Sequence, residues 1–268
     1  MDRIDEPGLT GNDNQNEERD FSKGFAVEEG GAHVINNDGA GGVHMGIAAR
    51  MIAVFFKPQQ LFATMPAKSK WWVPVLLTTI VSLVTTWLAL PKLKEMMLAA
   101  MPANTSIAAG QLDTIVRIQS ISVIAMSAAS VIIGVFIMAA LYYFLCVVSG
   151  GEGKYKQALT IVSYVGLIGA LSLIFRTVLL CVIPGAKFDQ SFTSLALLLP
   201  MDAPKTWLST ILSSVDLFSI WTLIVTAIGL KTMYRMKGKK AWVIVFATWI
   251  VFVAVSVAAV AVFASKTM

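Results

Sequence analysis

Two long apolar runs joined by a short basic segment dominate the C-terminal part of the sequence. The runs, residues 210–230 and 241–264, contain a single charged side chain, Asp216. Each run reaches the about 20 residues that an α-helix needs to cross the roughly 30 Å hydrocarbon core of a bilayer. Between them lies a basic hinge without any acid, whose cations are Lys231, Arg235, Lys237, Lys239 and Lys240. Cationic loops between spans stay in the cytoplasm, so the hinge predicts the orientation of the whole chain.

The composition also indicates an integral membrane protein. Hydrophobic residues make up 56% of the chain and charged residues 14%, whereas about a quarter of the residues of a soluble domain are charged. The net charge of +5 does not indicate nucleic-acid binding, because acids collect in residues 1–45 and bases collect at the ends of the apolar runs. Bases in those places are typical of contact with anionic lipid head groups. We therefore expect the lipid bilayer and anionic head groups as partners, and no nucleic acid.

The apolar pattern predicts an all-α, polytopic membrane protein whose transmembrane helices form a bundle of five. The predicted spans are residues 71–90, 120–148, 158–183, 210–230 and 241–264. Residues 184–208 include an apolar stretch too short to span, which predicts an interfacial or re-entrant segment.

The N-terminal part divides into a tail and a short helix. Residues 1–45 are acidic, rich in Gly and Asn and poor in large apolar side chains. Such a segment cannot bury enough surface to fold, so we expect a disordered tail. Residues 46–65 place apolar side chains on one side of a helix and basic or amide side chains on the other. This pattern predicts an amphipathic helix in the membrane interface or, equally, one that packs under the bundle.

Lys and Arg orient the predicted bundle. Counting spans back from the hinge places residues 50–70 and the loop at 149–157 on the hinge side of the membrane, and that side holds the larger number of Lys and Arg. The positive-inside rule assigns this side to the cytoplasm. We therefore expect a multi-pass protein of the cell inner (cytoplasmic) membrane with its N-terminus in the cytoplasm and its C-terminus outside.

Two ionisable side chains stand out inside the predicted spans, Arg176 and Asp216. A charge at membrane depth is costly and is therefore usually paired or functional. Both residues lie at a similar depth from the outer ends of their spans, so we expect them to form an ion pair. The pair either fixes the register of two helices, which we favour, or binds a lipid phosphate or takes part in transport.

The loop after the second span offers Gly150, Gly151 and Gly153 followed by Lys154. This order is similar to that of a phosphate-binding loop. However, Tyr155 stands where that loop needs Ser or Thr to hold magnesium, and its first glycine is also missing. The glycines are better explained as a tight turn between two helices.

Catalytic groups are scarce outside the tail. Both histidines, His33 and His44, lie in residues 1–45. The acids outside the tail are dispersed along the chain: Glu95, Asp113, Glu152, Asp189, Asp202 and Asp216. General acid–base catalysis and metal binding both need such groups close together. The sequence therefore predicts that the protein is not an enzyme and holds no metal or cofactor.

Several short segments occur in an order that is familiar. They are FFKPQQLF with Pro58 and Phe62, GGEGKYKQAL, SYVGLI with Tyr164, and DLFSIWTLIVTAIGL with Gly229. In this order the chain resembles the bacterial branch of the Yip1 (YIPF-like) family. The resemblance implies a five-span membrane domain over residues 46–268 with the tail in the cytosol. Eukaryotic members resemble trafficking factors that bind one another and small GTPases. This sequence lacks their DLYGP-type motif, so the resemblance does not extend to GTPase binding.

Two functional hypotheses follow. The first is a non-enzymatic scaffold or organiser of the Yip1 type, which acts through helix contacts and its cytoplasmic face and associates with itself or with another membrane protein. The alternative is a small transporter or lipid-handling protein in which Arg176 and Asp216 line a polar path between helices.

Overall fold

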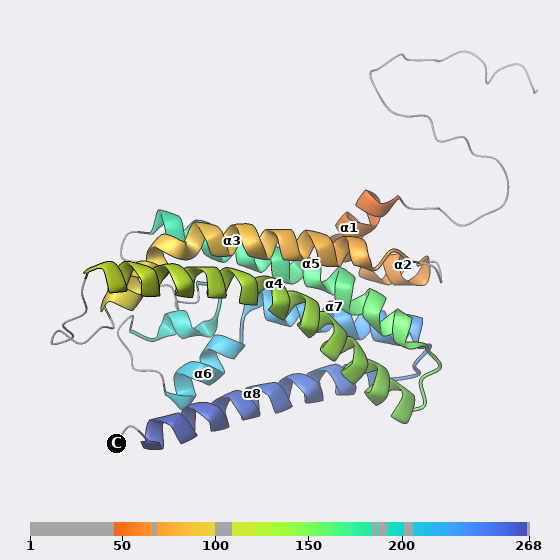
Figure 1. The fold of residues 1–268 in the computed structure, drawn as a ribbon. Coiled ribbons are helices and arrows are strands. Elements are labelled where there is room, and N and C mark those ends of the chain that lie inside the picture. Colours follow the sequence, from red (N-terminus) through yellow and green to blue (C-terminus); the bar gives the residue numbers. More distant parts are fainter. Residues whose placement is uncertain are drawn as a thin grey trace, which may run out of the picture. The chain divides into compact units, whose positions relative to one another are not determined.

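Helices make up most of the part of the chain that the structure describes. The computed structural model describes residues 46–65, 69–99, 109–183, 186, 192–200 and 206–266, and no strand occurs among them. The helices in chain order are α1 (Ile47–Phe56), α2 (Pro58–Ala63), α3 (Trp72–Ala99), α4 (Ala109–Val148), α5 (Tyr155–Val182), the 3₁₀ helix η1 (Leu195–Leu198), α6 (Trp207–Ser214), α7 (Leu217–Met233) and α8 (Lys240–Lys266) (Figure 1). The all-α class is confirmed. The predicted tail, residues 1–45, lies outside the described residues.

Within the described residues, four helices are long and apolar enough to cross a membrane: α3, α4, α5 and α8. This confirms a multi-pass membrane protein. Two of them are longer than expected. Helix α3 continues through Pro91 to Ala99, although we predicted that its span ends at residue 90. Helix α4 begins at Ala109 rather than near residue 120. The added turns carry charged residues, which membrane-spanning segments exclude but helices outside the bilayer tolerate.

The predicted span at residues 210–230 is not one continuous helix, which corrects our expectation. Val215 and Asp216 leave the helical conformation, with ψ values of 88° and 147°, and they separate α6 from α7. The Asp216 carboxylate accepts hydrogen bonds from the backbone N–H groups of Phe218 and Ser219 at 3.0 and 3.1 Å. This is the N-cap arrangement that starts a new helix. Helix α7 has 17 residues, about 25 Å of rise, and is shorter than the four long apolar helices α3, α4, α5 and α8.

Helix α5 occupies the centre of the helix packing. It contacts α3, α4 and α7, and α1 also touches it (Figure 1). Ile161, Tyr164 and Ile168 are fully buried, and their spacing of three and four residues places them on one side of the helix. Helix α8 packs on α6 and α7 and keeps much of its apolar surface exposed. Exposed apolar surface of this kind is what a bilayer covers.

Helices α1 and α2 combine the two alternatives for residues 46–65. Lys57 separates them, and Pro58 opens α2 at a position where its missing N–H costs nothing. Leu61 and Phe62 are buried, and α2 packs on α7. On the other side α1 exposes Ile52 (61%) and Phe56 (78%). One face therefore packs on the bundle, while the other remains apolar and exposed as in an interfacial helix.

Candidate functional site

The glycine loop and the basic hinge, which the sequence analysis treated separately, lie against each other. We call residues 149–154 together with 231–240 the junction. The Tyr234 hydroxyl donates a hydrogen bond to the Lys154 carbonyl at 3.1 Å. In return the Glu152 N–H donates to the Tyr234 carbonyl at 3.2 Å. The Lys240 ammonium donates to the Ser149 carbonyl at 3.1 Å. Backbone and side-chain bonds thus join the α4–α5 loop to the α7–α8 connection.

Tyr234 is the central residue of the junction. It caps the C-terminus of α7, where its N–H donates to the Leu230 carbonyl at 3.0 Å, and only 1% of its surface is exposed. Burial raises the pKa of its hydroxyl above the ordinary value of 10.0 because a buried phenolate would lose its hydration. The hydroxyl therefore keeps its proton and remains a hydrogen-bond donor to Lys154.

The glycines of the loop are explained by the approach of Tyr234 and by one backbone conformation. A Cβ on Gly153 would lie 2.3 Å from Tyr234 Cδ1, and one on Gly151 would lie 2.9 Å from the Cys146 carbonyl oxygen. Gly150 has φ +81°, which side-chain-bearing residues rarely adopt. The loop follows α4 directly and leads into α5, so these glycines build a tight helix-to-helix turn.

The hinge cations lie exposed beside this packed centre. Lys231 lies in the last turn of α7, and Lys240 begins α8. The remaining hinge cations, Arg235, Lys237 and Lys239, lie between the two helices, and all of them are exposed. Arg235 has φ 50°, a left-handed conformation that is uncommon outside glycine. The junction therefore presents several cations from a backbone that hydrogen bonds hold in place.

A close helix contact near the end of α7 positions the hinge. A Cβ on Gly229 would lie 2.8 Å from Ile161 Cγ2 and 3.0 Å from Phe62 Cε2. Helix α7 thus approaches α5 and α2 at a point where only glycine fits without movement. Gly229 lies one helical turn before Met233, the last residue of α7. The contact therefore determines where Tyr234 meets the glycine loop.

Asp216 lies at the start of α7, away from the junction, and forms a second hydrogen-bonded site. The Thr193 hydroxyl donates to its carboxylate. Backbone bonds run from Leu195 N to the Val215 carbonyl and from Leu217 N to the Thr193 carbonyl, at 3.0 and 3.3 Å. Part of the predicted re-entrant segment is therefore attached antiparallel to the break between α6 and α7. Arg176 lies half-buried on α5, and its pairing with Asp216 stays a prediction.

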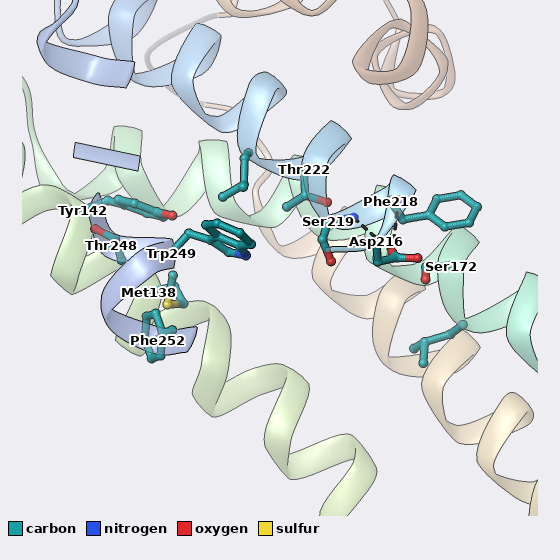
Figure 2. Close-up of a pocket in the computed structure, with 13 residues that line it drawn as sticks. Met138, Tyr142, Ser172, Asp216, Phe218, Ser219, Thr222, Thr248, Trp249 and Phe252 are labelled. Carbon is teal, nitrogen blue, oxygen red and sulfur yellow. Dashed lines mark hydrogen bonds between the residues drawn. The ribbon is translucent and has the colours of Figure 1, made fainter. Parts of the chain in front are cut away.

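A cavity of about 290 Å³ lies between α4, α5, α7 and α8 and includes Asp216 in its lining. Figure 2 shows Asp216 at one side of it with its bonds to the following backbone N–H groups, and Trp249 and Tyr142 further along. Hydroxyl groups of Ser172 and Thr222 also border it. Most of the remaining lining is apolar. The cavity contains one of the two predicted intramembrane charges.

Sequence reasoning missed Tyr234, although a signal was present. It is the only aromatic residue in the hinge, residues 231–240. An aromatic side chain within a run of cations has no role in keeping a loop solvated, so it could have been suspected of packing. Its partner, however, is 80 residues away.

Comparison with known proteins agrees with the resemblance. A model of the Yip1 domain matches residues 52–260. Membrane protein YknW of Bacillus subtilis (strain 168) is 33% identical over 150 residues, which are 54% of this chain. The matched part covers 63% of YknW, so the chain spans less than two thirds of the length of that relative. No solved structure matches the chain. Both the glycine loop and the hinge lie within residues 52–260, which the Yip1 domain model matches. The chain therefore belongs to the Yip1 domain family of membrane proteins.

Proposed function

We propose that the protein is a non-enzymatic scaffold of the cell inner membrane, which organises other membrane components through the junction. In this proposal the N-terminus and the junction face the cytoplasm, and the C-terminus lies outside. The larger number of Lys and Arg on the junction side supports this orientation.

The observation that carries the proposal is the combination of a fixed backbone with exposed charge. Tyr234, Glu152 and Lys240 make the hydrogen bonds that join loop and hinge. Lys237 and Lys239 remain exposed at the turn of the hinge. A surface with a preformed backbone loses little conformational entropy when a partner binds. Clustered cations also favour encounter with an acidic surface, whether of a second copy of this chain or of another membrane protein.

The test is purification of the full-length protein in a mild detergent, followed by native mass spectrometry of what remains bound. We expect a homo-oligomer or a defined protein partner with the wild type. Charge reversal at the hinge by Lys237→Glu with Lys239→Glu should release it. The control is Lys94→Glu, a charge reversal at an exposed residue near the C-terminal end of α3. This variant should retain the bound partner. A wild-type protein that remains a monomer without protein partners would contradict the scaffold role.

The cavity beside Asp216 supports a second candidate, a small transporter or lipid-handling protein. Its volume of about 290 Å³ lies close to the lower end of the range for small-ligand sites, about 300–1,000 Å³. Under this hypothesis the same mass spectrometry should detect a lipid or small anion that Arg176→Gln removes. The absence of such a ligand from the wild-type protein would count against transport.

A further inference from the structure

A second cavity lies at the junction, where the end of α7 meets α2 and the start of α8. Its volume is about 530 Å³, which is within the usual range of ligand-binding sites. Polar and amphipathic side chains from all three helices and from the hinge line it: Gln59, Lys231, Thr232, Arg235 and Trp242. The cavity is thus built by segments far apart in the sequence.

The charges of this lining have one sign. Lys231 and Arg235 both border the cavity, and none of the described lining residues is acidic. Two like charges that share a cavity repel each other, and an anion between them removes that repulsion. A guanidinium presents paired N–H donors that fit two oxygens of a phosphate, and an ammonium adds a compact charge. Lys231 and Arg235 together are therefore more favourable with a phosphate between them than with water alone.

The backbone of Arg235 is held in place beside the cavity. Its φ of 50° is uncommon for a residue with a side chain, and such conformations persist where the surrounding structure imposes them. Here the neighbours on both sides are fixed. The Tyr234 carbonyl accepts from the Glu152 N–H at 3.2 Å, and the Met236 N–H donates to the Lys231 carbonyl at 3.1 Å. The junction thus holds an arginine at the cavity in a conformation that glycine would adopt more easily.

Trp242 indicates the depth of the cavity in the membrane. It lies in the first turn of α8, at the end of a membrane-spanning helix, and its ring stacks on Phe246 with the centroids 6.2 Å apart. Tryptophan is enriched at the level of the lipid head groups, where its indole N–H can remain hydrated. The Gln59 amide and the indole N–H add uncharged donors to the cations. The lining therefore combines donors with a position at head-group level.

We propose that this cavity binds the phosphate of an anionic lipid head group, held by Lys231 and Arg235. Basic pockets between transmembrane helices are known to take such head groups. The site is distinct from the exposed Lys237 and Lys239, which carry the proposed scaffold role. An experiment can therefore contradict the lipid proposal without contradicting the scaffold proposal, and the reverse is also true.

The test uses the full-length protein in an uncharged detergent and native mass spectrometry with added lipid. Phosphatidylglycerol is titrated against phosphatidylcholine, whose choline group cancels the phosphate charge. We expect the wild type to hold phosphatidylglycerol at least tenfold more tightly. Lys231→Gln with Arg235→Gln should remove this preference. Lys237→Gln with Lys239→Gln removes the same charge from the same hinge, but neither residue lines the cavity, and this control should retain the preference.

A third variant protects the test against misfolding. Arg235→Gly removes the guanidinium but suits the φ of 50°, so it should fold as well as the wild type and still lose most of the preference. Equal binding of both lipids by the wild type, or an equal loss in the Lys237/Lys239 control, would overturn the proposal. Displacement of the lipid by millimolar inorganic phosphate would instead identify a soluble phosphate as the ligand and would overturn the lipid assignment.

Discussion

Replacement of Gly153 by alanine tests how tightly the junction is packed. The new Cβ would lie 2.3 and 2.4 Å from Cδ1 and Cε1 of Tyr234, and 2.8 Å from the Gln157 side-chain oxygen. Carbon atoms in contact prefer about 3.5–4.0 Å, so the ring must move by roughly 1 Å. Tyr234 is only 1% exposed, and movement in any direction meets packed neighbours or breaks its hydrogen bond to Lys154.

The expected loss of unfolding free energy is about 2 kcal/mol. Overpacking of a well-filled site costs about 1–3 kcal/mol. A weakened hydrogen bond from Tyr234 to Lys154 adds about 0.5–1.5 kcal/mol. Against this, alanine restricts the unfolded chain more than glycine does, which returns about 0.4–1 kcal/mol. The steric term is the largest, so the sign of the change is destabilising.

The assay is reversible unfolding of the purified protein in mixed micelles, followed by circular dichroism. Gly134→Ala is the matched control, because Gly134 lies inside α4 and a Cβ there meets no described atom within 4 Å beyond its chain neighbours and the nearby backbone of its own helix. Alanine at that position should be neutral or stabilise the helix by up to about 1 kcal/mol. The steric cause is tested by repeating Gly153→Ala in a Tyr234→Leu background, where it should cost much less. A Gly153→Ala protein as stable as the wild type, or an unchanged cost in that background, would refute the argument.

Four further predictions use the same unfolding assay. Gly229→Ala should lower the unfolding free energy by about 1–3 kcal/mol through overpacking. Adding Phe62→Leu should restore part of this loss, because it replaces the ring that the new Cβ meets by a shorter side chain; no recovery would mean that Phe62 is not the obstacle. Tyr164→Phe should be neutral or stabilising, since the buried hydroxyl has no hydrogen-bond partner among the described residues; a clear loss would reveal a partner. Asp216→Ala should cost about 1 kcal/mol as a lost N-cap while Asp216→Asn keeps most of the stability; equal losses would show that the charge itself matters. Stability should fall as the pH rises above 10.0, because the unfolded chain releases the Tyr234 proton there and the folded chain keeps it; Tyr234→Phe should reduce this fall.

The class of the protein and its long helices followed from composition and length. Uninterrupted apolar runs of about 20 residues have few alternatives to a transmembrane helix. The ends of the helices were harder to predict, because an amphipathic extension such as the one after Pro91 continues the helix without lengthening the apolar run. Residues 213–216, with the sequence SSVD, contain a recognisable helix start signal. We overlooked this signal because the apolar residues on both sides of it made residues 210–230 look like one span.

The candidate site was predicted in parts. The glycine loop and the basic hinge were each identified from local composition. Their contact was not, because it depends on Tyr234 meeting a loop 80 residues earlier in the chain. Local patterns carry no information about such a pairing. The cavity formed by Gln59, Lys231 and Trp242 was missed for the same reason, since no two of these residues lie on the same helix.

The bond between Tyr234 and Lys154 also bears on how the protein is made. The two residues are 80 positions apart, so at about 5–20 residues per second the ribosome adds Tyr234 roughly 4–16 s after Lys154. During that interval the helical hairpin of α4 and α5 emerges with its turn lacking its aromatic partner. The junction is therefore completed only after α7 and Tyr234 have been added to the chain.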